Sequence, residues 1–236
     1  MKESDPLQVD LWLTNVVNRP CYKLASHRFV TRKDLTDLPQ AAFVWAKLPV
    51  EKIEDCAKLI DIGFYIVDTN LKYSGSLSIN SSMDSTIRLA QPHDQEVILG
   101  IAATAFQYSR FHLDENFSDG IANQTRVSWV KSFFDGDRGD VMIVAIDKHD
   151  QPVGFLLSKI ENNEITIDLV ALEVASRGQG LASAMIGSLS LYYPDGNLLK
   201  VGTQAVNIPS VRLYEKLGFH VSEANHILHW HSTRDS

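Results

Sequence analysis

Hydrophobic positions along this 236-residue chain follow two spacings. Recurrence every three to four residues predicts helices over 50–62, 92–106, 181–192 and 207–217, with a further helix capped by Ser118. Short apolar runs predict strands over 41–48, 64–71, 86–90, 141–146, 153–160, 164–174 and 198–203, with a last strand or pair from Phe219 onward. Because helices and strands are interspersed along the chain, the expected fold class is α/β.

A run of small polar residues at 74–82 has the composition of a linker. It separates an expected smaller N-terminal lobe, residues 1–80, from a larger lobe, residues 84–236. One pattern occurs in both lobes: a helix, then Ile62-Gly63-Phe64 or Leu217-Gly218-Phe219, then a strand. Either the first lobe is a shortened copy of the end of the second, or both are ordinary helix–Gly–strand junctions.

The charge balance restricts the partners. With 22 Lys and Arg against 29 Asp and Glu the net charge is −7, which argues against nucleic acid and anionic membrane surfaces as ligands. An anionic ligand would have to be held by backbone amides or a few placed cations. No apolar run reaches the roughly twenty residues of a membrane span, and no secretory leader pattern is present, so the cytoplasm is the expected compartment.

The clearest local motif runs from Leu172 to Ala182, where an expected strand passes through a Gly-rich turn into a helix. Unpaired amides and the positive dipole end at a helix start favour a phosphate group. Gly178 and Gly180 would let the anion approach the backbone, and Arg177 could add a cation. The alternative is a tight turn without a ligand.

Arg177-Gly178-Gln179-Gly180-Leu181-Ala182 resembles the (Gln/Arg)-x-x-Gly-x-(Gly/Ala) signature of the GNAT superfamily of N-acetyltransferases, and residues 207–219 resemble its second hallmark. The resemblance covers the chain from Thr86 onward and the first eighty residues only loosely. It implies a mixed, mostly antiparallel sheet flanked by helices, with a truncated N-terminal lobe. It also implies acetyl-CoA as co-substrate and no metal.

The resemblance assigns roles to individual positions. It makes Tyr214 the general acid that protonates the leaving thiolate, which suits a phenol of ordinary pKa about 10. Asn207 is expected to bind the pantetheine arm or the acceptor, and the backbone of Leu172 and Val174 to grip the pantetheine. The remaining coenzyme contacts are expected from Arg177, Gly178, Gln179, Gly180, Leu181 and Ala182.

The general base is left open between two carboxylates. Strand alternation places Asp168 on one face with Leu172 and Val174, and Glu173 on the other, which slightly favours Asp168. Either carboxylate could instead be a solvated residue or an ion-pair partner.

A narrower resemblance, through residues 105–111, is to the dTDP-fucosamine acetyltransferases. It implies a nucleotide-linked 4-amino-4,6-dideoxy sugar of surface-polysaccharide biosynthesis as acceptor, contacted by Tyr108, Arg110 and Phe111. Alternatively, Phe111 packs in the core and Arg110 is a surface cation. Two other functions stay open, namely acetylation of another small amine or a protein amine, and a non-catalytic acyl-CoA sensor. A homodimer would be common for the superfamily.

Histidines 226, 229 and 231 invite a metal interpretation, but no nearby Cys or carboxylate completes a site. They are expected to be exposed residues of a terminal strand. The two cysteines, Cys21 and Cys56, are expected to be buried thiols, since they fit neither a disulfide framework nor a metal site.

Overall fold

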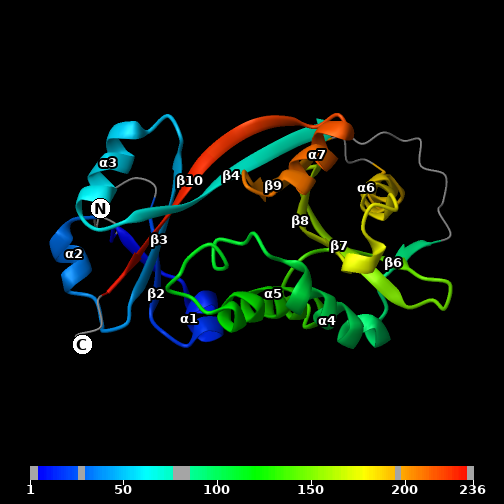
Figure 1. The fold of residues 1–236 in the computed structure, drawn as a ribbon, viewed down its shortest axis with the longest axis horizontal. Coiled ribbons are helices and arrows are strands. Elements are labelled where there is room, and N and C mark those ends of the chain that lie inside the picture. Colours follow the sequence, from blue (N-terminus) through cyan, green and yellow to red (C-terminus); the bar gives the residue numbers. More distant parts are fainter. Residues whose placement is uncertain (1–4, 26–29, 77–85, 195–197, 233–236) are drawn as a thin grey trace.

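The computed structural model describes residues 5–25, 30–76, 86–194 and 198–232, which form one ten-stranded sheet covered by helices (Figure 1). The strands are β1 (Leu7–Val9), β2 (Cys21–Leu24), β3 (Phe43–Pro49), β4 (Tyr65–Ser76), β5 (Ile87–Leu89), β6 (Val141–Ile146), β7 (Pro152–Glu161), β8 (Glu164–Leu172), β9 (Leu198–Gln204) and β10 (His220–His231). The α-helices are α1 (Leu11–Val17), α2 (Arg32–Thr36), α3 (Ile53–Asp61), α4 (Gln95–Ala105), α5 (Asp119–Phe134), α6 (Leu181–Tyr192) and α7 (Ile208–Lys216).

The sheet order is β1-β2-β3-β10-β4-β9-β8-β7-β6-β5, and among these strands only the β2–β3 and β8–β9 pairs are parallel. The predicted α/β class and the mostly antiparallel sheet are therefore confirmed. The prediction missed β1, α1, β2 and α2, because elements of three to seven residues are too short to show a period. None of the described helices has the length and apolar run needed to cross a bilayer.

Two βαβ units exchange strands at the middle of the sheet. One unit is β3–α3–β4 and the other is β9–α7–β10, and in each the second strand pairs with the first strand of the other unit. The two exchanged strands, β4 and β10, also pair with each other (Figure 1). Gly63 and Gly218, with φ of 108° and 81°, follow the two helices, so the repeated sequence pattern occupies equivalent places.

One sheet thus runs through both predicted lobes, and residues 77–85 of the predicted linker lie outside the described residues. The division into 1–80 and 84–236 stays a prediction.

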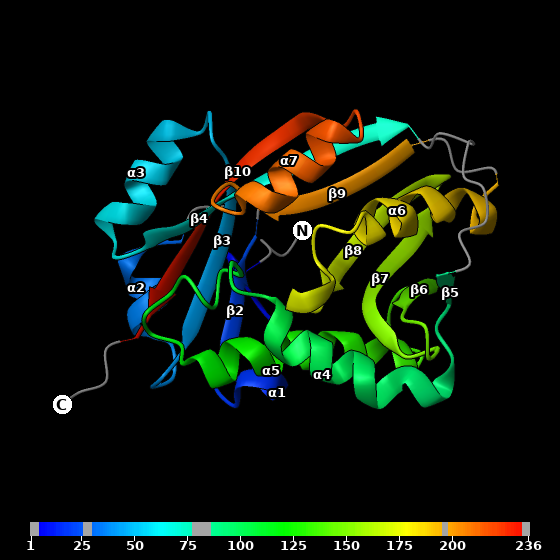
Figure 2. The same cartoon turned by 45° about the vertical axis from the view of Figure 1, so that its right-hand side comes forward.

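Helices cover the half of the sheet from β9 to β5 on both faces. In Figure 2, α6 lies over β7 and β8 while α7 lies beside β9, and α4 and α5 run together on the other face. Met185 and Leu189 of α6 pack with Ile165 and Ile167, and each such buried side chain contributes about 1.5–3 kcal/mol.

The buried side chains of β8 switch from one face of the sheet to the other at Asp168. Leu157 of β7 pairs with Leu169 and Ser158 pairs with Ile167, so Asp168 is an extra residue that forms a β-bulge. Ile167 therefore packs on the α6 side, whereas Leu169, two residues later, packs on the α4 side. The bulge increases the bend of β8 just where its pairing with β9 stops.

Candidate active site

A cavity opens between β8 and β9. The two strands pair in parallel only as far as Ile167 and Val201, and beyond these residues they separate around a space of about 230 Å³. The walls come from the end of α4 and the loop after it, from α5, from the separated strands and from α7; they include Ala105, Tyr108, Arg126, Asp168, Val170, Leu172, Ala182, Gln204, Asn207 and Tyr214.

The separation of the strands leaves backbone groups of β8 without a strand partner. Glu173 donates its N–H to Val153 of β7, and alternate residues of an antiparallel strand point to opposite neighbours. The amides of Val170 and Leu172 therefore point toward the cavity. The predicted strand is two residues too long, because Val174 lies in a 3₁₀ turn, Val174–Ser176, with its side chain 72% exposed. Val170, and not the predicted Val174, lines the cavity together with Leu172.

The Gly-rich turn lies at the cavity's rim. Gly178 and Gly180 have φ of 77° and 83°, a conformation that residues with a Cβ rarely adopt. Gly180 is the residue before α6, and no described side chain caps this helix. The amides of the first turn, from Leu181 and Ala182, are thus available to an anion.

The two long side chains of this turn bind protein backbone. Arg177 donates to the carbonyls of Ala105 (3.2 Å) and Leu172 (3.4 Å), and Gln179 donates to the carbonyl of Ala175 (3.1 Å). Arg177 thereby joins the end of α4 to the end of β8. In this arrangement, contact with an anion falls to the backbone amides.

Helix α7 supplies the other wall. Asn207 precedes it and its side chain accepts from the N–H of Ser210 (3.3 Å), so it is the helix cap as well as a cavity residue. Tyr214 also lines the cavity and is only 2% exposed, with its ring centroid 5.5 Å from that of Tyr73. Burial raises the pKa of Tyr214 well above its ordinary value, so the phenol holds its proton at neutral pH.

Asp168 lines the cavity, but it is not free. Its carboxylate accepts from Nε of Arg138 at 3.2 Å, and the guanidinium of Arg138 lies 4.1 Å from the ring centre of Trp129 in α5. The simple alternation used to place Asp168 with Leu172 and Val174 was wrong, because the bulge falls at Asp168 itself. Glu173, the other carboxylate, is exposed.

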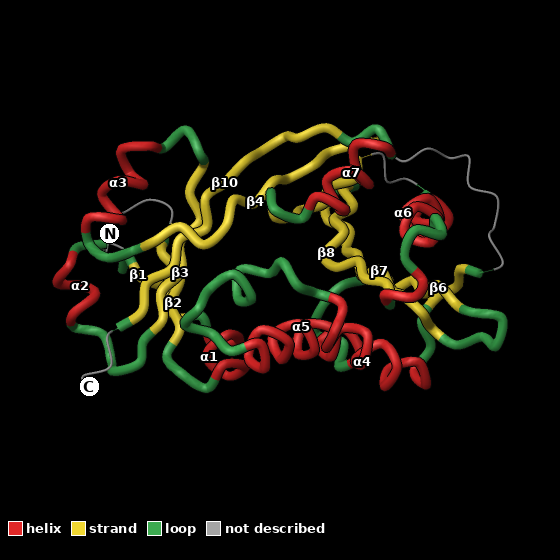
Figure 3. The backbone as a smooth tube through the Cα atoms, in the orientation of Figure 1, coloured by secondary structure: helices red, strands yellow, loops and turns green. Residues whose placement is uncertain are grey.

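The loop between α4 and α5, residues 107–117, lies against β4 and β10 (green in Figure 3). Tyr108 lines the cavity. Phe111 is 4% exposed and packs with Phe117 (centroids 5.2 Å apart), which favours its packing role. Arg110 lies over Trp45, 4.2 Å from the ring centre, so it is not a simple surface cation.

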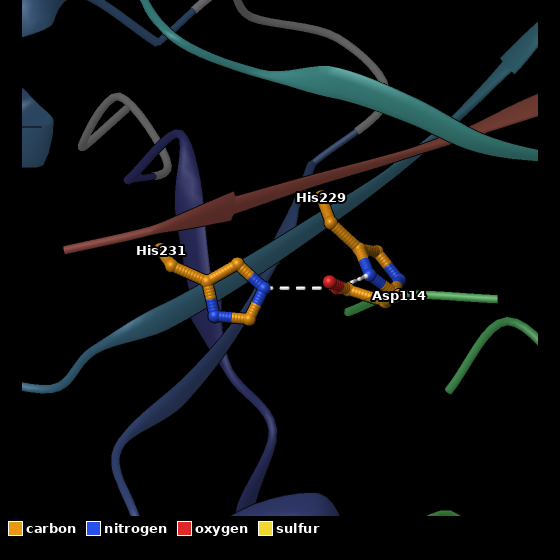
Figure 4. Close-up of side chains that lie close together, drawn as sticks. All are labelled: Asp114, His229 and His231. Carbon is orange, nitrogen blue, oxygen red and sulfur yellow. Dashed lines mark hydrogen bonds and ion pairs between the residues drawn. The ribbon is translucent and has the colours of Figure 1, made fainter. Parts of the chain in front are cut away.

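The expectation of exposed histidines was wrong for all three, because His226 is half-buried beside Oγ1 of Thr69 (3.2 Å) and the other two are more deeply buried. His229 is fully buried, and together with His231 it meets Asp114 of the 107–117 loop (Figure 4). Asp114 accepts from Nδ1 of His229 (2.6 Å), Nε2 of His231 (2.9 Å) and the hydroxyl of Tyr65 (2.7 Å). Burial alone would raise the pKa of Asp114, but these hydrogen bonds outweigh it and hold that pKa far below its usual range.

These three groups lie close enough to hold a metal ion, but their protons argue against it. Arg19 approaches Nδ1 of His231 at 2.9 Å, and an arginine can only donate. His231 therefore carries its proton on Nε2, the atom that faces Asp114, and that atom has no lone pair for a metal. The cluster fits a hydrogen-bonded anchor, which fixes the 107–117 loop to the end of β10.

Sequence reasoning missed Asp68 of β4. It is 6% exposed, its Oδ1 has no partner among the described residues, and burial raises its pKa to about 6. Asp68 lies two residues from Asn70, whose cross-strand neighbour is the cavity residue Gln204. A single acidic residue within an apolar strand was the only signal available.

Residues 105–219 match the model of a family described as the acetyltransferase (GNAT) family. The chain is 28% identical over 208 residues to the spore coat polysaccharide biosynthesis protein SpsD of Bacillus subtilis (strain 168), a match that covers 85% of this chain and 68% of SpsD.

Solved structures share the fold at low identity. A GCN5-related N-acetyltransferase from Sphaerobacter thermophilus matches with a TM-score of 0.57 and 15% identity, over 85% of this chain and 64% of that one. A functionally unknown conserved protein from Staphylococcus epidermidis ATCC 12228 matches with a TM-score of 0.67 and 14% identity, over 99% of this chain and 94% of that one.

Proposed function

We propose, from the match of residues 105–219 to the acetyltransferase (GNAT) family, that the chain acetylates the amino group of a nucleotide-linked 4-amino-4,6-dideoxy sugar. The observation that carries the proposal is the cavity between β8 and β9, which joins the coenzyme turn, Tyr214 and the 107–117 loop in one space. The printed name of the B. subtilis relative, a spore coat polysaccharide biosynthesis protein, supports a sugar as acceptor.

Acetyl-CoA is the co-substrate that this fold implies, and the cavity has groups to hold it. We assign its pyrophosphate to the amides at the start of α6, beside Gly178 and Gly180. The amides of Val170 and Leu172 would bind the pantetheine as an added strand does, and one of them would polarise the thioester carbonyl. Asn207 would contact the same arm from α7.

The reaction needs one acid and one base. The neutral amine attacks the thioester carbon, and the tetrahedral intermediate collapses as the carbon–sulfur bond breaks. Tyr214 donates its phenolic proton to the departing thiolate. The phenol is fully protonated before the reaction, and its raised pKa makes it a weaker acid than a free phenol.

For the base we favour Asp68 over Asp168. Asp168 is held by Arg138, whereas Oδ1 of Asp68 has no partner among the described residues. A carboxylate with a pKa of about 6 is ionised at neutral pH, and it is more basic than an ordinary aspartate. Because Asp68 is not among the residues that line the cavity, it would accept the proton of the attacking amine through water.

The test is release of CoA thiol from acetyl-CoA across dTDP- and UDP-linked amino sugars, with spermidine and a lysine peptide as controls. Turnover restricted to a nucleotide-linked 4-amino sugar is the expected result. Turnover on spermidine or the peptide, with none on any sugar, would refute the acceptor and keep the acetyltransferase. Coenzyme binding without turnover on any amine would favour a sensor.

A further inference from the structure

Two arginines on the acceptor side of the cavity have no anionic partner in contact. Arg126 of α5 lines the cavity, and Arg110 follows the cavity residue Ser109 in the 107–117 loop. Their guanidinium groups rest on aromatic rings, Arg126 on Phe106 (5.1 Å) and Arg110 on Trp45 (4.2 Å). Neither guanidinium has a hydrogen bond or an ion pair to any described residue, and Nε of Arg126 is buried without a partner.

The neighbouring Arg138, by contrast, has a carboxylate partner. It lies against the same Trp129 as Arg126, and its guanidinium is paired with Asp168. Arg126 has no such carboxylate, and Arg110 feels Asp10 and Asp68 only at longer range. Two positive charges thus remain unneutralised inside a chain whose net charge is −7.

Both guanidinium groups stay positively charged at neutral pH. Burial lowers the pKa of Arg110 and of Arg126 to about 10, which is still well above neutral pH. A buried charge without a counter-ion is unfavourable for folding. An anionic ligand that enters the cavity would remove this cost.

We propose that Arg126, supported by Arg110, binds the diphosphate group of the acceptor. The proposal rests on the proposed function and names the part of the substrate that this site selects. Two forked guanidinium groups match a diphosphate, which offers two charges and several acceptor oxygens, better than one carboxylate. The same charges would repel a polyamine or a lysine-rich peptide.

The coenzyme's own pyrophosphate has a separate place at the start of α6, so the two anions can be distinguished. The experiment titrates thymidine diphosphate by calorimetry into the full chain saturated with CoA, for wild type and Arg126→Met. We expect the substitution to weaken this binding by at least about tenfold, as the loss of a charged hydrogen-bond donor does. Arg212→Met, at an exposed position of α7, should leave it unchanged.

The urea midpoint of the variant shows whether Arg126 binds a ligand or supports the fold. Met keeps the unbranched stem on Phe106 and removes the buried charge, so Arg126→Met should unfold in urea at the same or a higher midpoint than wild type. A lower midpoint would mark Arg126 as structural and overturn the proposal. Unchanged binding of thymidine diphosphate would overturn it too, as would an equal loss of CoA affinity.

Wild-type kinetics keep the two proposals apart without relying on a variant. A nucleotide amino sugar should have a KM at least about tenfold below that of the neutral methyl glycoside of the same sugar. Equal KM values would refute the diphosphate site while the acetyltransferase stands. Binding of thymidine diphosphate that depends on Arg126, without turnover on any sugar, would refute the proposed function and leave the anion site.

Discussion

The two sides of the cavity differ in the groups that they offer to a ligand: one offers backbone amides and the other offers charged side chains. The proposed coenzyme side uses backbone: the left-handed Gly178 and Gly180, and the unpaired amides of β8. The proposed acceptor side uses charged side chains: Arg126 of α5 lines the cavity, while Asp68 of β4 and Asp114 of the loop lie outside its lining residues. A ligand shared by many enzymes can be met by one local segment, whereas a particular acceptor requires residues gathered from distant parts of the chain.

The difference is also energetic. Backbone amides at a helix start are solvated when no ligand is bound, so they cost little. Oδ1 of Asp68 and Nε of Arg126 have no hydrogen-bond partner among the described residues, and each of these buried groups lowers the stability of the unliganded protein. Asp114 is the exception on the acceptor side, because its hydrogen bonds from His229, His231 and Tyr65 compensate its burial.

The largest expected effect is on kcat, and it tests the proposed proton donor Tyr214. Tyr214→Phe removes only the phenolic hydroxyl, so kcat should fall by about 10²–10⁴-fold while CoA affinity is retained. Steady-state kinetics and calorimetry measure the two quantities. Tyr73→Phe is the matched control, since Tyr73 is buried in the same cluster and does not line the cavity. Equal kcat for Tyr214→Phe and wild type would remove the assigned acid.

The second prediction concerns the anchored part of the acceptor side. Asp114→Ala leaves buried donors of His229 and Tyr65 unpaired, so the free energy of unfolding should fall by about 3–5 kcal/mol. Urea unfolding measures it, with the exposed Asp61→Ala as control. A loss no greater than that of the control would mean that Asp114 does not anchor the loop.

The third prediction has opposite signs for activity and stability. The pKa of Asp68 is raised to about 6 in the fold, so the carboxylate costs stability once it ionises. Asp68→Asn should therefore raise the free energy of unfolding at pH 7 by roughly 2–3 kcal/mol, by the linkage of pKa to stability, while kcat/KM falls.

The sign can be checked by pH. The folded pKa lies above the unfolded value of 3.8, so the cost is absent below about pH 4 and complete above about pH 6. The stability gap between Asp68→Asn and wild type should open across that window. A gap that is constant with pH would show that the effect does not come from ionisation, and unaltered kcat/KM would return the role of base to Asp168.

The smallest expected effect belongs to the coenzyme side. Gly180→Ala forces a residue with a Cβ into φ of 83°, which should cost roughly 1–2 kcal/mol and weaken CoA binding. Gly100→Ala, inside α4, should instead stabilise by about 0.5–1 kcal/mol and leave CoA binding intact. Calorimetry and urea unfolding distinguish the two, and equal CoA affinities would exclude a tight backbone contact at Gly180.

The difference between local segments and residues that are distant in the sequence also explains which parts of the site could be predicted. The Gly-rich turn, α7 and the resemblance they carry lie within short segments, so the sequence alone identified them. The two histidine partners of Asp114 lie more than a hundred positions away, and no local pattern links Asp114 to His229. The bulge at Asp168 was equally hidden, because the apolar residues of β8 keep their alternation while the face they cover changes.

The exchange of strands also affects how the chain is made. During translation β3 and β4 leave the ribosome early. Strand β10, which lies between them in the sheet, is the last of the described elements to emerge. Until then β3 and β4 present unpaired edges, which are prone to association with other chains. The sheet that carries Asp68 is therefore complete only after β10 has been made, so a ribosome that stalls before β10 would release a chain whose proposed acceptor side is not assembled.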